Sequence, residues 1–320
     1  MDNKLHLANF KVVKQMKKTN EIPKGVKMIQ APQIWAETKG EGVTIAVLDT
    51  GCDTKHIELS NRIIGGRNFT TDDGGNQHIF EDYNGHGTHV AGTIAASLNH
   101  RGVVGVAPKV NLLIVKVLDK NGEGEYDWTI KGIKYAIAQQ VDIISMSLGG
   151  VEDLPALHKV IKKAVLQHDI PIVCAAGNEG DGKTQTNELS YPAYYNEVIS
   201  VGAIDSDHQS SRFTNSNSKV DLVAPGEDIT STYINGGYAV LSGTSMAAPH
   251  VSGALALIKN ITSKQFDRKL TEIELYAQLI RRTLPLGFDT RFEGNGLIYL
   301  TLLDSLSTTF NNLTMRAYQL

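Results

Sequence analysis

The sequence lacks the features that mark secreted, membrane-spanning or nucleic-acid-binding proteins. Only two of the 320 residues are cysteines, Cys52 and Cys174, which is too few for a disulfide framework. No apolar run approaches the roughly 18 residues that a membrane-spanning helix needs. Residues 1–7 lack the apolar core of a secretory signal, and 31 basic against 34 acidic residues leave no positive excess for nucleic acid. We therefore expect a cytosolic protein with a well-buried core.

Short β-branched runs alternate with helical patterns from Val43 onward. The runs are continuously apolar, which favours strands buried on both faces of a parallel sheet. The expected strands are 43–48, 111–118, 141–146, 170–174 and 197–203, and the expected helices are 127–139, 157–165, 245–257 and 272–282. This alternation predicts an α/β fold, with helices on both faces of a mostly parallel sheet and a site at the carboxyl ends of the strands.

The two ends of the chain differ from its middle. Residues 1–20 are rich in Lys and Asn with weak periodicity, so we expect an arm rather than part of the core. Residues 307–320 form a polar tail, which leaves one domain over residues 21–306. Within that domain, residues 70–75 and 180–190 are expected to be surface loops.

The first of three unusual segments is Asp49-Thr50-Gly51, which directly follows the expected strand 43–48. An acid followed by a turn glycine places Asp49 at the carboxyl end of a buried strand. Taken alone, Asp49 is more typical of an ordinary turn or helix-capping aspartate.

The second segment places His86 between two glycines, Gly85 and Gly87, at the start of a helix of small residues. His86 and His89 lie three apart and could bind a metal, but no glutamate follows His86 as in the zincin pattern. A purely structural histidine is the other alternative.

The third segment places Ser245 between a glycine turn and an apolar helix. Because proline has no backbone N–H, we expect Pro249 in the first turn of this helix, where that N–H would have no acceptor within the helix. The positive end of the helix dipole would then favour negative charge at Ser245 Oγ. An ordinary N-cap serine is the alternative.

Together the three segments indicate nucleophilic catalysis. A serine hydroxyl needs an adjacent base, and the base needs an acid that fixes its tautomer. The segments Asp49-Thr50-Gly51, His86–Thr93 and Gly243–His250 resemble the three signatures of subtilisin-like serine proteases, in the same chain order. The resemblance covers residues 23–303 and is strongest to the intracellular subtilisins of Bacillus-type bacteria. It implies a three-layer fold and a serine endopeptidase with Asp49, His86 and Ser245 as catalytic residues.

The resemblance also implies the residues around the reacting bond. Ala175–Gly180 resembles the oxyanion segment, with Asn178 as the side-chain donor beside the backbone N–H of Ser245. Gly122-Glu123-Gly124 and Ser147-Leu148-Gly149 resemble the two edges that bind an extended peptide by β-augmentation. The implied S1 pocket comprises Ala175, Ala176, Gly177, Glu179 at the rim and Ser190 near the base. We expect apolar or large P1 residues, although Glu179 could admit a basic one.

Calcium is the cofactor that the resemblance implies. The family's site uses a loop after the His helix, here residues 97–103, and mixed oxygen ligands of this kind suit Ca²⁺. The matching positions are Glu58, Ser97, Asn99, Arg101 and Val103, with Asn20 a weaker candidate. Where Glu58 stands, many relatives carry aspartate.

The resemblance further implies regulation and assembly. Intracellular relatives carry a short arm that covers the active site until it is cleaved, with a Leu-Ile-Pro-Tyr motif. Here the corresponding residues are Leu7-Ala8-Asn9-Phe10, without the proline. The resemblance to these relatives implies a zymogen. Because intracellular relatives are dimeric, it also implies a homodimer. A protease dedicated to a few partner proteins and a catalytically silent peptide-binding protein remain as alternatives.

Overall fold

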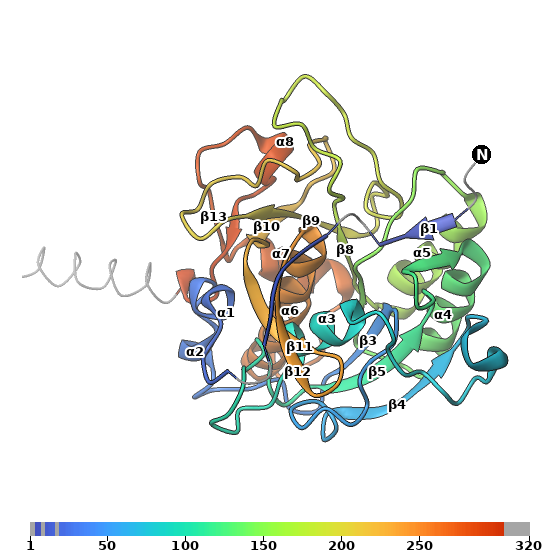
Figure 1. Ribbon diagram of the computed structural model, residues 1–320. Coiled ribbons are helices and arrows are strands. Elements are labelled where there is room, and N and C mark those ends of the chain that lie inside the picture. The colour runs from blue at the N-terminus through green and yellow to red at the C-terminus, as the bar shows by residue number, and fades with distance from the viewer. Residues whose placement is uncertain (1–3, 8–9, 17–18, 304–320) are drawn as a thin grey trace, which may run out of the picture.

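The computed structural model describes residues 4–7, 10–16 and 19–303 (Figure 1). The expected tail over residues 307–320 lies outside the described residues, as do Ala8 and Asn9 of the arm.

A nine-stranded sheet forms the centre of the molecule. Its strand order is β13-β14-β10-β9-β8-β7-β3-β5-β4, and every neighbouring pair is parallel except β13 with β14. The strands are β3 (Thr44–Asp49), β4 (Ile63–Asn68), β5 (Asn111–Lys116), β7 (Ile143–Met146), β8 (Ile172–Ala175), β9 (Ile199–Ile204), β10 (Leu222–Pro225), β13 (Thr283–Leu284) and β14 (Leu297–Ile298). The predicted α/β class with a mostly parallel sheet is confirmed.

Helices cover both faces of this sheet, as Figure 1 shows. One face carries α3 (His86–Ala95) and α6 (Thr244–Phe266), and the other carries α4 (Tyr126–Ala138) and α5 (Pro155–His168). The remaining helices are α1 (Lys24–Met28), α2 (Ala31–Ile34), the 3₁₀ helix η1 (Asp72–Gly75), α7 (Glu272–Ile280) and α8 (Thr290–Glu293). Among the described residues, no helix has the length and apolarity needed to cross a membrane.

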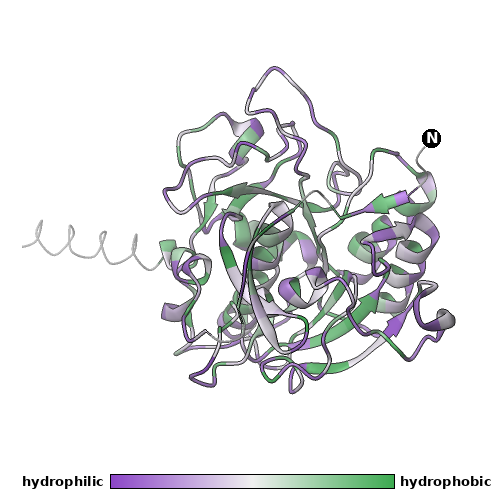
Figure 2. Cartoon of the chain, in the orientation of Figure 1, coloured by the Kyte–Doolittle hydropathy of each residue, from purple (hydrophilic) through white to green (hydrophobic). Residues whose placement is uncertain are grey.

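Strand β3 shows why these runs are apolar without alternation. Ile45 and Val47 pack into the hydrophobic core that contains α3 and α6, whereas Ala46 and Leu48 pack into the core that contains α4 and α5. Both faces of β3 are therefore buried, as expected for a strand inside a parallel sheet. Figure 2 shows the central strands as largely hydrophobic beneath helices of mixed hydropathy.

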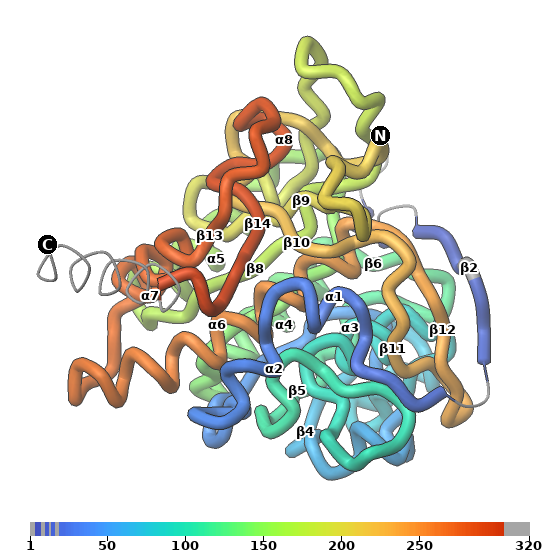
Figure 3. The backbone as a smooth tube through the Cα atoms, turned by 90° about the vertical axis from the view of Figure 1, so that its left-hand side faces the viewer, coloured from blue at the N-terminus to red at the C-terminus, as the bar shows by residue number. Residues whose placement is uncertain are grey.

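The N-terminal residues extend two smaller sheets. Strand β1 (Lys4–His6) pairs antiparallel with β6 (Glu123–Glu125). Strand β2 (Lys11–Met16) adds to the hairpin of β11 (Ile229–Tyr233) and β12 (Gly237–Ser242), and lies beside β12 in Figure 3. The expectation that the arm contributes nothing to the core is wrong at Leu5, whose side chain is fully buried among residues of the α4 and α5 core.

Two histidines on the core-facing helices are fully buried. His89 of α3 bonds through Nε2 to the carbonyl of Ile229, and His250 of α6 bonds through Nδ1 to the carbonyl of Met246. Since a carbonyl only accepts, these nitrogens carry the protons. The second nitrogen of each ring is buried and has no hydrogen-bond partner within residues 4–7, 10–16 and 19–303. Burial lowers the pKa of His89 to about 3 and that of His250 to about 4.

These pKa values predict that the two buried histidines lower the stability of the fold in acid. Below about pH 6.5 the unfolded chain gains protons that the two folded-state histidines do not accept, so their contribution to the unfolding free energy falls as pH drops toward about 4, whereas Glu58 and Glu272, whose pKa values burial raises to about 7, contribute with the opposite sign. Urea unfolding between pH 7 and pH 4 measures this slope. The slope of the unfolding free energy against pH reports the extra protons that the unfolded state binds. His250→Gln should reduce this number by up to one, whereas the exposed control His208→Gln should leave the slope unchanged. Equal slopes in all three proteins would contradict the assignment.

Candidate active site

Asp49 and His86 meet at the carboxyl end of the sheet. Asp49 ends β3, His86 begins α3, and His86 Nδ1 lies 2.8 Å from Asp49 Oδ1, with both side chains buried. The backbone N–H of Thr50 donates to the same oxygen at 2.8 Å. Because a carboxylate only accepts, Nδ1 carries the proton of the neutral ring and Nε2 keeps its lone pair. His86 Nε2 is buried without a hydrogen-bond partner among the described residues.

Two glycines allow this close approach of α3 to the end of β3. Gly51 has φ of +110°, a conformation that side-chain-bearing residues rarely adopt. A Cβ on Gly87 would lie 2.2 Å from the carbonyl oxygen of Gly51, inside any van der Waals contact. The glycines beside Asp49 and His86 are therefore required by geometry at this junction.

Ser245 lies in the first turn of α6, where backbone N–H groups lack acceptors within the helix. Its hydroxyl donates to the carbonyl of Ser147 at 3.3 Å, and Ser147 Oγ donates to the carbonyl of Ser245 at 3.0 Å. The placement of Pro249 in the first helical turn is wrong: α6 begins at Thr244, so Pro249 lies in the second turn. Since Pro249 cannot donate to the carbonyl four residues earlier, the Ser147 hydroxyl takes that place.

Asn178 is oriented by the start of α6. Its Oδ1 accepts from both the backbone N–H and the hydroxyl of Thr244, each at 2.8 Å. These donors distinguish the two ends of the amide and direct Nδ2 toward Gly243, where an added Cβ would lie 3.0 Å from it. The side-chain amide is therefore fixed beside Ser245.

The two predicted peptide-binding edges are occupied by the arm. His6 and Gly149 exchange backbone hydrogen bonds of 2.9 and 3.0 Å, and the N–H of Leu7 donates to the carbonyl of Gly122 at 3.0 Å. The pairing of β1 with β6 includes Gly124, opposite Leu5. The arm backbone thus forms a strand between residues 122–124 and Gly149.

The other predicted pocket residues lie around the same edges. Ala175 is the last residue of β8, and residues 176–177 come directly after it. Ser190 Oγ lies against Gly149, because a Cβ added to Gly149 would be 2.1 Å from it. The carboxylate of Glu179 accepts from Asn215 Nδ2 at 2.9 Å. One oxygen of Glu179, the acid that could admit a basic P1 residue, is therefore already bonded to a neutral amide.

The predicted calcium residues gather where the loop over residues 97–103 meets Glu58. The side chain of Glu58 is buried, and its carboxylate accepts from the N–H of Val103 at 3.2 Å and from the Tyr238 hydroxyl at 3.0 Å. Burial raises the pKa of Glu58 to about 7. Ser97 Oγ donates to the Glu58 carbonyl, and Asn99 Oδ1 accepts from the N–H of Arg101. The backbone of Asn20 forms an isolated parallel β-bridge with Gly102 of the same loop.

The alternative in which His86 and His89 share a metal conflicts with their contacts. His86 Nδ1 faces Asp49 of β3, whereas His89 Nε2 faces the carbonyl of Ile229 in β11. Throughout the described ranges, no group of three His, Cys, Asp or Glu side chains could hold a metal ion.

Sequence patterns missed two charged residues beside Asp49. Asp82 accepts five hydrogen bonds, among them those from the hydroxyls of Thr50 and Thr88. Lys116 ends β5 directly opposite Asp49 and is fully buried. The one signal in the sequence was a lysine that closes the apolar run of residues 112–115.

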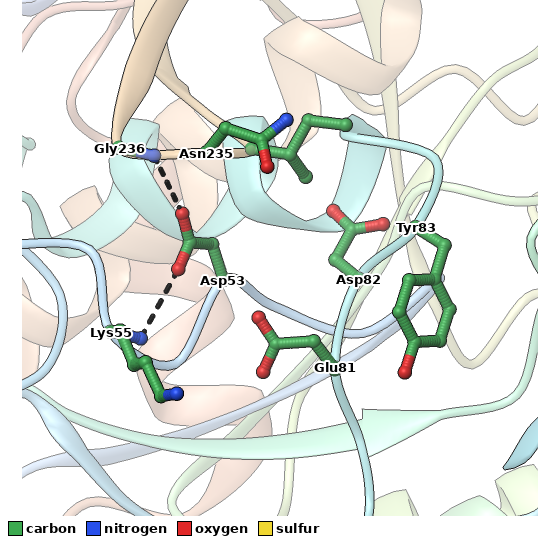
Figure 4. Close-up of a pocket in the computed structure, with 8 residues that line it drawn as sticks. Asp53, Lys55, Glu81, Asp82, Tyr83, Asn235 and Gly236 are labelled. Atoms are coloured by element: carbon green, nitrogen blue, oxygen red, sulfur yellow. Dashed lines mark hydrogen bonds between the residues drawn. The ribbon is translucent and has the colours of Figure 1, made fainter.

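Asp82 also lines an acidic pocket together with Asp53 and Glu81 (Figure 4). The oxygens of these carboxylates already accept hydrogen bonds, from Gly236 N–H to Asp53 and from the Thr54 hydroxyl to Glu81. The pocket is therefore part of the framework that holds residues 49–54.

Comparisons with known proteins agree with this geometry. Residues 40–296 match the Subtilase family. The chain is 63% identical over 311 residues to the "Intracellular serine protease" of Paenibacillus polymyxa, covering 97% of this chain and 95% of the relative. It is 56% identical over 309 residues to the "Major intracellular serine protease" of Bacillus subtilis, covering 96% and 97%. Subtilisin DY of Bacillus licheniformis is 42% identical over 278 residues, covering 87% and 96%.

The matched residues span both the strand that ends at Asp49 and the helix that begins before Ser245. The chain therefore belongs to the subtilase family, and it is a serine endopeptidase.

Proposed function

We propose that this endopeptidase hydrolyses peptide bonds of intracellular proteins through a triad of Asp49, His86 and Ser245 and an acyl-enzyme intermediate. The observation that carries the proposal is the buried 2.8 Å contact between His86 Nδ1 and Asp49 Oδ1. In the part of the chain that the structure describes, this contact leaves the Nε2 lone pair of His86 without a partner, at the edge of the sheet where α6 presents Ser245.

In this mechanism the Ser245 hydroxyl turns from the Ser147 carbonyl toward His86 Nε2. Ser245 Oγ attacks the scissile carbonyl carbon while His86 takes the hydroxyl proton, and Asp49 stabilises the imidazolium that forms. Collapse of the tetrahedral intermediate breaks the C–N bond, and His86 returns the proton to the leaving amine. Water then attacks the acyl-enzyme by the same proton transfers and releases the acid product.

Charge on the substrate oxygen would be held by Asn178 Nδ2 and the backbone N–H of Ser245. The two Thr244 contacts to Asn178 Oδ1 keep the amide from rotating, which is the preorganisation that such donors require. The substrate backbone would pair with residues 122–124 and 147–149, and the small residues 175–177 favour an apolar or large P1 side chain.

Active-site labelling tests the triad. A fluorophosphonate should form an adduct on Ser245 of the wild-type protein, because only a serine activated by an adjacent base reacts readily. His86→Ala should abolish labelling at Ser245 and lower kcat by about 10⁶, a magnitude known for subtilisin itself. Mass spectrometry locates the adduct, with the buried helical His250→Gln as a folding control. Absence of an adduct on a folded wild-type protein would favour the silent peptide-binding alternative.

We further propose that the N-terminal arm makes the protein a zymogen. The arm uses Gly149 and Gly122, the same backbone groups that a substrate would need. Leu5 is fully buried, Lys4 forms a 2.8 Å ion pair with Glu123, and the Phe10 ring lies 4.9 Å from the His86 ring. An arm in this place competes directly with any peptide.

Weakening the arm should therefore raise activity. Leu5→Asp places a carboxylate in an apolar pocket, so the arm should leave the cleft and the initial rate on a peptide substrate should rise about tenfold or more. A chain that begins at Glu21 should match it. Val12→Asp is the control, because Val12 lies in β2 with a substantially exposed side chain. Equal initial rates in all four proteins, without self-processing on mass spectrometry, would contradict inhibition by the arm.

Calcium is the cofactor that we propose for the loop over residues 97–103. The buried Glu58 carboxylate forms no ion pair within the described residues, and a bound cation would supply the missing positive charge. Glu58, Asn99 and loop carbonyls would hold a hard, oxygen-preferring ion such as Ca²⁺. When bound, the ion would fix the loop against the segment around Glu58.

This proposal predicts a calcium-dependent melting temperature. Because Ca²⁺ would bind only the folded state, Tm should rise with its concentration, by an amount equivalent to about 3 kcal/mol at 100 times Kd. Glu58→Gln should remove the dependence, whereas the exposed Glu37→Gln should keep it. The scans should include magnesium to exclude an ionic-strength effect. An unchanged Tm after thorough chelation and calcium addition would rule the site out.

The expected cytoplasmic location and homodimer complete the proposal. The location is supported by the printed names of the two intracellular relatives. The dimer rests on the resemblance alone, because residues 307–320 lie outside the described residues.

A further inference from the structure

A lysine is buried beside the catalytic aspartate. Lys116 is the largest side chain in the described part of the chain that is fully removed from solvent. It closes β5 at the position paired with Asp49 of β3. A buried ammonium is costly, and apolar residues of similar volume often replace buried ion pairs without loss of stability. Its presence at this edge therefore calls for a reason other than stability.

The contacts of the ammonium point toward the segment that carries Asp49. Lys116 Nζ donates to the carbonyl of Thr50 at 2.5 Å and pairs with Asp72 Oδ2 at 3.0 Å. It also lies 5.7 Å from the centre of the Tyr83 ring, one of the pocket residues in Figure 4. Three different groups thus surround the charge, and one of them adjoins Asp49 in the chain.

Other groups fix the rest of the same segment. The carbonyl of Asp49 accepts from the N–H groups of Val117 and Leu118, at 3.0 and 3.2 Å. The hydroxyl of Thr50 donates to Asp82 and accepts from the N–H of Gly87. The N–H of Thr50 donates to Asp49 Oδ1, and its carbonyl, across Cα in the next peptide unit, accepts from Lys116. A displacement of Thr50 as a whole would therefore move the carboxylate that orients His86.

We infer that Lys116 is a positioning residue for catalysis: its ammonium, held by Asp72, fixes the Thr50 carbonyl and thereby the Asp49 carboxylate. Lys116 touches neither substrate nor reacting atoms, so it acts only through Asp49 and His86. The 3₁₀ helix that carries Asp72 is then part of the catalytic framework, although its sequence indicated only a surface loop. The inference rests on the proposed triad, so its test separates the two.

The central experiment measures kcat and KM for Lys116→Met on the full chain. All proteins are processed by the same trace of affinity-tagged wild-type enzyme, which is removed by its tag before assay, and mass spectrometry confirms a common N-terminus. We expect kcat to fall by about tenfold to a hundredfold with KM changed less than about twofold, because misplaced catalytic groups affect the chemical step. Lys131→Met is the matched control, since Lys131 is solvent-exposed in its ion pair with Asp127.

The same substitution in a protein that already lacks the Asp49 carboxylate distinguishes a positioning role from a loss of stability. In an Asp49→Ala protein, whose residual activity no longer uses the carboxylate, Lys116→Met should lower kcat by less than about twofold. A role in stability alone would lower kcat by the same factor in both backgrounds, and that result would overturn the inference. Fluorophosphonate labelling of wild-type Ser245 tests the triad separately, so failure of the triad is recognised independently of Lys116.

A double variant covers the case in which Lys116→Met fails to fold. Lys116→Met with Asp72→Asn leaves no unpaired buried charge, and asparagine can still accept from the N–H of Lys120. We expect this protein to melt cooperatively and to keep the low kcat. Wild-type kcat in the double variant would show that Lys116 only neutralises Asp72, and would overturn the inference.

Discussion

The hydrogen bond between His86 and Asp49 is the contact on which the rest of the site depends. It joins the end of a strand to the start of a helix, so neither side chain can move without moving a packed element. Strand β3 is buried on both faces, and α3 has no exposed residue. Because packed interiors resist small displacements, the imidazole is held by the whole core rather than by Asp49 alone.

The sequence predicted the parts of this architecture that follow from local chemistry. The apolar runs around Val47 and Ile144 identify central strands, since both faces of such strands must be apolar. The glycines beside Asp49 and His86 identify the junction because only glycine permits its geometry. The sequence did not predict strand β4, because Gly65 and Gly66 interrupt its apolar pattern. This strand lies at an edge of the sheet.

Other features depend on contacts between distant segments and leave no local pattern. The burial of Leu5 depends on β6, more than a hundred residues away in sequence. The position of Pro249 in the second turn depends on the Ser147 hydroxyl, which satisfies the carbonyl that a proline cannot. Lys116 looks like the polar end of a strand until its neighbours across the sheet are known. Such residues are determined by tertiary contacts rather than by propensity.

Charge at the carboxyl edge of the sheet explains why this region can be rigid and still contain several acids. Asp49 accepts through Oδ1 from His86 and from the N–H of Thr50, whereas its Oδ2 is buried without a partner among the described residues. Asp72 pairs with Lys116, and Asp82 accepts from five donors that include the N–H groups of Asn84 and Gly85. An unpaired buried carboxylate would take up a proton or draw in water, and either change would loosen the loop that carries it. Each of these carboxylates is held by at least one donor within the framework. Outside this framework, the arm lies as a strand along the two backbone edges predicted to bind a peptide.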